Sequence, residues 1–138
     1  MKETVLSLLA FTGWTLALVV VLVTLRSALT LSGRRAANAF SPSGEDVSPF
    51  SERLVRAHAN CLENLPVFAA LVLITALLER FDVTAPLAPV VVVLRVLQSS
   101  VHLVSTSVPA VLVRFTFFVG QIAIFVWWGV ALVRSSLG

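Results

Sequence analysis

A long run without charged residues is the feature of this chain that most limits its fold. No Asp, Glu, Lys or Arg occurs from Val5 to Leu25. A stretch of this length matches the hydrocarbon core of a bilayer, which is about 30 Å thick and is crossed by about 20 residues of helix. The run is longer than the roughly 7–15 apolar residues of a secretory signal. No small-residue cleavage pattern follows it, so we expect a retained transmembrane helix.

The rest of the chain is similarly apolar. Of the 138 residues, 58% are hydrophobic and only 12% are charged, and the mean hydropathy is +0.98. A soluble domain carries about 25% charged residues, and one of this size has too little interior to bury the excess apolar side chains. The apolar runs are continuous rather than alternating, which excludes a closed β-barrel. The sequence therefore predicts a single-domain, all-α integral membrane protein.

Four membrane helices are predicted from the apolar runs and the breaks between them. Ser51 resembles a helix N-cap before the second run, and Pro109 suits the first turn of the fourth helix. Trp127 and Trp128, near the end of that helix, are typical of a membrane interface. The predicted helices are 5–26, 53–79, 84–105 and 109–134, forming a four-helix bundle with one long loop at 27–52.

The basic residues predict the orientation in the membrane. With four spans the two termini share one face, which carries only Lys2, Arg80 and Arg134. The opposite end carries five arginines, namely Arg26, Arg34, Arg35, Arg53 and Arg56. By the positive-inside rule, the long first loop is expected in the cytoplasm and the termini are expected to face outward.

Three of the predicted helices carry a polar stripe. Spacings of three or four residues place the members of each stripe on one helix face. Ionisable groups are costly inside a membrane, so the stripes are expected to face water or to meet one another. The stripes are Arg53, Arg56, Asn60, Glu63 and Asn64 on the second helix, Arg95, Gln98, Ser99 and His102 on the third, and Arg114 and Gln121 on the fourth.

Two interpretations of these stripes remain open. In the first they hold the helices together, with Glu63 paired to an arginine and the amides bridging helices. In the second they bind an anion, because Arg56, Arg95 and Arg114 outnumber the one carboxylate and an unpaired buried guanidinium group is costly. Arginine binds carboxylates through two hydrogen bonds and keeps its charge. The surplus therefore favours an anionic ligand.

Other classes of function are excluded or less favoured. The single cysteine, Cys61, excludes an internal disulfide and is interpreted as a packing residue, and no Cys/His pattern predicts a metal site. The net charge is +3, but the ten Lys and Arg residues form no basic stripe, so nucleic-acid binding is not expected. A small transporter is less favoured, because the buried charges cluster toward one side of the membrane.

Two segments carry a resemblance to a known family. Residues 56–68, RAHANCLENLPVF, resemble the RAxxNxxEN-P-F signature of the MAPEG proteins, the membrane-associated proteins in eicosanoid and glutathione metabolism. Residues 114–120, RFTFFVG, look like the fourth-helix segment of that family. The number of spans, the long first loop and Arg95 also fit. The resemblance covers essentially the whole chain and is to a bacterial-type microsomal glutathione transferase-like member.

The resemblance implies a homotrimer in a bacterial inner membrane, surrounded by lipid, that takes glutathione or a similar anionic thiol as cosubstrate between subunits near the cytoplasmic side. Arg114 is then the catalytic residue that stabilises the thiolate for attack on a hydrophobic, lipid-soluble electrophile. A thiol with a pKa of about 8.5 is mostly protonated at neutral pH. The implied glutathione-binding residues are Arg56, Asn60 and Glu63, with Arg53 at the rim of the site. Arg95 and His102, from the polar stripe of the third helix, are further candidates for binding glutathione.

The implied activity is that of a glutathione transferase or peroxidase. The alternative is a non-catalytic binding or scaffold protein with the same fold. The chain departs from several eukaryotic members at Ala59, where they have a second basic residue, and at His102, where they often have Tyr. The protein contains no Tyr.

Overall fold

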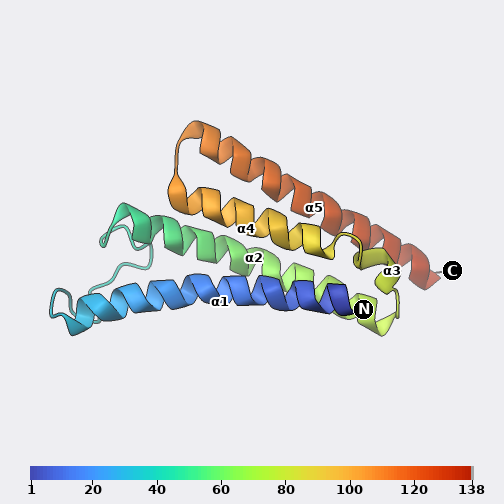
Figure 1. The fold of residues 1–138 in the computed structure, drawn as a ribbon, viewed down its shortest axis with the longest axis horizontal. Coiled ribbons are helices and arrows are strands. Elements are labelled where there is room, and N and C mark those ends of the chain that lie inside the picture. Colours follow the sequence, from blue (N-terminus) through green and yellow to red (C-terminus); the bar gives the residue numbers. More distant parts are fainter. Residues whose placement is uncertain (138) are drawn as a thin grey trace.

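The computed structural model describes residues 1–137 and forms an antiparallel helical bundle (Figure 1). The helices are α1 (Lys2–Leu31), α2 (Pro49–Leu77), α3 (Phe81–Thr84), α4 (Ala88–Val104) and α5 (Val108–Leu137). Both termini lie at one end, here called the terminal end. Residues 32–48 and the α4–α5 turn lie at the other, here called the loop end (Figure 1). The predicted all-α bundle of four long helices is confirmed.

Three of the long helices meet the length and apolarity of a membrane span. They are α1, α2 and α5, with 30, 29 and 30 residues. Helix α4 has 17 residues, which at a rise of about 1.5 Å per residue extend over roughly 26 Å. The chain is an integral membrane protein.

The third predicted helix, 84–105, is shorter than expected. The structure places the short α3 before it and begins α4 only at Ala88. Pro86 lacks the N–H that a continuous helix needs and disfavours helical geometry at the residue before it. Pro89 then occupies the first turn of α4, where its missing N–H has no cost. The two prolines therefore separate α3 from α4.

The long loop is also shorter than predicted, spanning 32–48 instead of 27–52. Helix α1 continues past 26 to Leu31 and is followed by Gly33 at φ 68°, the left-handed geometry that commonly terminates a helix. Helix α2 begins at Pro49 rather than 53, because the side chain of Ser48, not Ser51, is the N-cap. Its hydroxyl oxygen accepts the Ser51 N–H at 3.0 Å, and Pro49 follows as a favoured first residue.

An aromatic cluster packs the bundle toward the terminal end. The ring of Phe68 meets Phe11 edge-on at 5.5 Å between centroids and stacks on Phe125 and Trp128 at 6.0 Å. Trp128 is completely buried in the bundle, whereas its neighbour Trp127 is 50% exposed, so only Trp127 presents its ring to the surroundings of the chain. Consecutive helical residues point about 100° apart, so only one of the two tryptophans can face the bundle.

The hydrophobic cluster nearer the loop end is built from smaller side chains. Its buried members are Leu18, Leu54, Ala57 and Cys61. The Cys61 sulfur lies 3.4 Å from the hydroxyl oxygen of Ser99 on α4, in agreement with a packing role. This half of the bundle has room for polar side chains between α2, α4 and α5.

Candidate functional site

A buried network of amide and guanidinium groups joins α2, α4 and α5. Arg95 on α4 is completely buried and donates from Nη1 to the side-chain oxygen of Asn60 on α2. Gln98 Nε2 donates to the same oxygen at 3.1 Å. Gln121 on α5 donates from Nε2 to Gln98 Oε1 at 2.9 Å and to the Phe117 carbonyl at 3.1 Å. The predicted meeting of the three polar stripes is thus confirmed.

Neutral groups rather than a carboxylate surround Arg95. Its guanidinium carbon lies 5.3 Å from the ring centre of Phe11 on α1, a cation–π contact. Among residues 1–137 no carboxylate lies within 4.0 Å of its nitrogens, and Nε and Nη2 make no hydrogen bond. Arg95 therefore fixes the positions of Asn60 and Gln98 while keeping its positive charge unneutralised.

A pocket of about 270 Å³ opens beside this network. Asn60, Gln98 and His102 form its polar wall, and Val111, Phe115 and Phe118 of α5 form its apolar wall. Arg114 also lines it. The α5 residues recur at spacings of three and four, so they share one helix face. The pocket thus combines a cation with an apolar surface.

Arg114 is the lining residue best placed to act on an anion. Its side chain is half-buried, and within residues 1–137 it makes no ion pair. Its Nε atom is buried and has no hydrogen-bond partner in the same residues. Arg114 lines the pocket together with His102, and a guanidinium group keeps its charge at neutral pH, so this part of the pocket carries a positive charge.

Two of the predicted arginines already have partners. Arg53 donates from Nε to the Leu103 carbonyl at 2.8 Å, which ties the start of α2 to the last turn of α4 next to His102. Arg56 pairs with Glu52 at 2.7 Å, and its side chain is 62% exposed. Both residues lie at the edge of the pocket and do not line it.

Glu63 lies apart from the network in the single chain. It is exposed on α2 and pairs with no arginine of residues 1–137, so the assumption that it is the one buried carboxylate does not hold there. The buried positions of α2 near it are Cys61 and Asn64, and Glu63 points about 100° away from Asn64. Asn64 instead donates to the Asn60 carbonyl at 3.2 Å.

The structure thus brings together only part of the predicted site. Asn60, His102 and Arg114 line one pocket, Arg95 lies behind Asn60, and the remaining three candidates lie outside the pocket. Phe115 and Phe118 were not among the predicted site residues. Their spacing is a usable signal, because Phe118 lies four positions after Arg114 and three after Phe115, the separations that place residues on one helix face.

Comparison with known proteins identifies one family. The MAPEG family model matches residues 4–133 and so covers α2, α4, the pocket and nearly all of α1 and α5. Neither a curated protein nor a solved structure gives a significant match. The chain belongs to the MAPEG family.

Proposed function

We propose that the protein binds glutathione, or a similar anionic thiol, and activates its thiolate for attack on hydrophobic electrophiles. The observation that carries this proposal is the guanidinium group of Arg114, which makes no ion pair within residues 1–137 and lies in a pocket with an apolar wall. The cation suits an anionic thiolate, and the phenylalanines suit an apolar second substrate. The pocket lies within the membrane bundle, which gives a lipid-soluble electrophile direct access.

The chemistry requires that the thiol lose its proton at neutral pH. A free thiol with a pKa of about 8.5 is only a few per cent thiolate at pH 7. A nearby positive charge favours the ionised form, and Arg114 keeps its charge at any physiological pH. Asn60 and Gln98, held by Arg95 and Gln121, supply fixed polar groups for orienting the peptide part of the ligand.

We further propose that the site is completed in a homotrimer. Glu63 and Arg56 are exposed on a helix long and apolar enough to cross the membrane, and ionisable side chains exposed to lipid are costly. A neighbouring subunit covering this face of α2 removes that cost. It also places Glu63 and Arg56 beside the ligand, the arrangement expected for binding between subunits.

The second candidate is a binding or scaffold protein without turnover. The observation that favours it is the tight internal network, in which amides satisfy one another and leave fewer groups for a ligand. It predicts binding of a ligand or a partner without conjugation. Isothermal titration of the detergent-solubilised protein with glutathione, followed by an assay with chlorodinitrobenzene, separates the two candidates. Absence of binding at millimolar glutathione to an intact oligomer contradicts the enzyme, and binding without conjugation favours the second candidate.

The decisive variant is Arg114→Ala. We expect turnover to fall about 100-fold, as when a single group stabilising an anion is removed. We expect little change in thermal stability, because Arg114 makes no ion pair with any residue from 1 to 137. The matched control is Arg134→Ala, which removes an exposed arginine at the other end of the same helix. Unchanged turnover in Arg114→Ala, or equal losses in both variants, rules out the thiolate role.

A further inference from the structure

A second pocket lies between the last turns of α1 and the first loop. It has a volume of about 480 Å³, and we call it the loop pocket. The pocket that contains Arg114 is lined by α2, α4 and α5, so the two pockets share no lining residue. The lining residues of the loop pocket are Arg26, Ser27, Thr30, Leu31, Ala37, Asn38 and Phe40.

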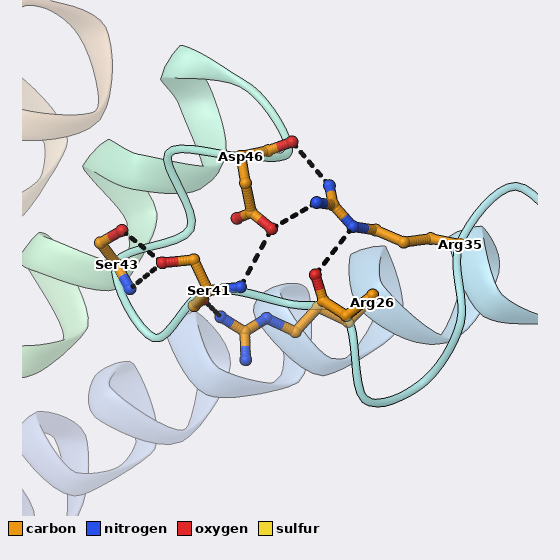
Figure 2. Close-up of polar contacts among 6 residues, drawn as sticks. Arg26, Arg35, Ser41, Ser43 and Asp46 are labelled. Atoms are coloured by element: carbon orange, nitrogen blue, oxygen red, sulfur yellow. Dashed lines mark hydrogen bonds and ion pairs between the residues drawn. The ribbon is translucent and has the colours of Figure 1, made fainter.

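The loop is folded tightly enough to form a lasting wall for this pocket. Figure 2 shows Asp46 held by Arg35, whose Nη2 lies 2.6 Å from the carboxylate, and by the Ser41 N–H at 3.0 Å. Gly44 lies so close to α2 that an added Cβ would approach the Ser51 hydroxyl oxygen to 2.8 Å. The loop therefore packs closely on the start of α2.

The two arginines of this loop end differ in their counter-charge. Both guanidinium groups lie over the ring of Phe40, with Arg26 at 5.5 Å and Arg35 at 5.4 Å from its centre. Arg35 is neutralised by Asp46. Arg26 donates only to the Ser41 carbonyl, at 3.0 Å (Figure 2), and its buried Nε makes no hydrogen bond within residues 1–137. Two guanidinium groups thus share the Phe40 ring, and in the described part of the chain Arg26 has no carboxylate partner.

The surroundings of Arg26 suit a phosphate group. Ser27, Thr30 and Asn38 bring hydroxyl and amide groups to the same pocket. A helix C-terminus ordinarily disfavours anions because its last carbonyls are free. Here the carbonyls of residues 28–30 accept backbone N–H groups from residues 32–35, so the end of α1 presents few free carbonyls to an anion.

The position of the pocket indicates which kind of phosphate. Helix α1 carries no charge from Val5 to Leu25, so Arg26 lies where the helix leaves the hydrocarbon. Val20, Val21 and Val23 are exposed just before it. Arginines at this depth attract anionic lipids. We propose that the loop pocket binds the phosphate-containing headgroup of an anionic lipid, whose acyl chains lie along α1.

The test measures binding of phosphatidylglycerol to the full chain in detergent, by native mass spectrometry and by the shift in Tm, with phosphatidylcholine as the neutral comparison. We expect Arg26→Gln to weaken phosphatidylglycerol binding roughly 10- to 100-fold, as for loss of hydrogen bonds to a charged group. Ser27→Leu narrows the pocket without changing the Arg26 contacts and is expected to weaken binding as well. Arg34→Gln removes an exposed arginine that does not line the pocket and serves as the matched control.

Selective loss in Arg26→Gln and Ser27→Leu supports the headgroup site. Equal losses in Arg26→Gln and Arg34→Gln overturn it, since diffuse attraction to a charged surface treats the two arginines alike. Equal affinity for phosphatidylcholine also overturns it. Inorganic phosphate is the last arm: if it displaces phosphatidylglycerol at comparable concentration, the pocket is a site for a free anion and the lipid proposal fails.

Discussion

The two halves of the bundle are held together by different chemistry. Toward the terminal end, Phe11, Phe68, Phe125 and Trp128 form a dense aromatic cluster. Toward the loop end, the buried apolar residues are Leu18, Leu54, Ala57 and Cys61, and a network of amides around Arg95 joins the helices there. A satisfied buried polar network fixes the positions of its members, whereas packed aromatic side chains stabilise mainly through the large areas that they bury. We infer that the terminal half supplies stability and the loop half supplies the site.

Among the substitutions that test this difference between the two halves, Phe68→Ala is expected to lower the free energy of unfolding most. The ring contacts three other aromatic rings and is completely buried, so its removal leaves a cavity that costs about 3 kcal/mol. Reversible unfolding in mixed micelles measures the loss. Leu73→Ala on the same helix is the control, because Leu73 is 60% exposed in the single chain. Similar losses in the two variants contradict the assignment of stability to the aromatic cluster.

The next effect concerns Asn60, the acceptor shared by Arg95 and Gln98. Asn60→Leu leaves a buried guanidinium group without this partner and is expected to cost about 2 kcal/mol, more than the roughly 0.6 kcal/mol typical of a hydrogen bond between membrane helices. Asn60→Asp keeps the acceptor and adds a negative charge beside Arg95. It is expected to preserve Tm and to weaken glutathione binding, because the new carboxylate repels an anion.

The two Asn60 variants separate the role of Asn60 in holding the helices from the role of the pocket's positive charge in binding the ligand. Unfolding measurements report the first, and isothermal titration with glutathione reports the second. If Asn60→Asp binds glutathione as tightly as the unmodified chain, the positive potential of the pocket is not what attracts the ligand. If Asn60→Leu is as stable as the unmodified chain, the network does not hold the helices together.

The sequence predicted the long helices and the meeting of their polar stripes, because apolar length and helical spacing are local properties. It did not predict that Trp128 is buried or that α3 separates from α4. Both depend on the position of the neighbouring helices and on the combined effect of Pro86 and Pro89. The loop pocket was also missed, because stacking of Arg26 on Phe40 depends on how the loop folds.

Three- and four-residue spacing correctly predicted the site residues on the part of each stripe that faces the bundle. It was wrong for residues at the edge of a stripe. Asn60, Arg95 and His102 lie where three- and four-residue spacing places them. Glu63 has the same spacing, but its side chain is exposed on the outer face of α2. A stripe wider than the helix contact cannot be buried completely by one subunit, so spacing alone does not indicate which of its members face a second chain.

The smallest effect is expected at the one ion pair of the terminal end within residues 1–137, between Arg80 and Asp82. The Arg80 hydrogen bonds, both at 3.0 Å, lower the pKa of Asp82 below its ordinary value. The pair's contribution is present above the unfolded pKa of about 3.9 and is lost as pH falls through the lowered folded value. Because both groups are exposed, solvent screens the pair.

Asp82→Asn should leave Tm at pH 7 nearly unchanged, with any difference disappearing in acid. A Tm loss at pH 7 equal to that of Asn60→Leu would show that charge pairing stabilises the terminal end as well, and the contrast between the two halves would be wrong.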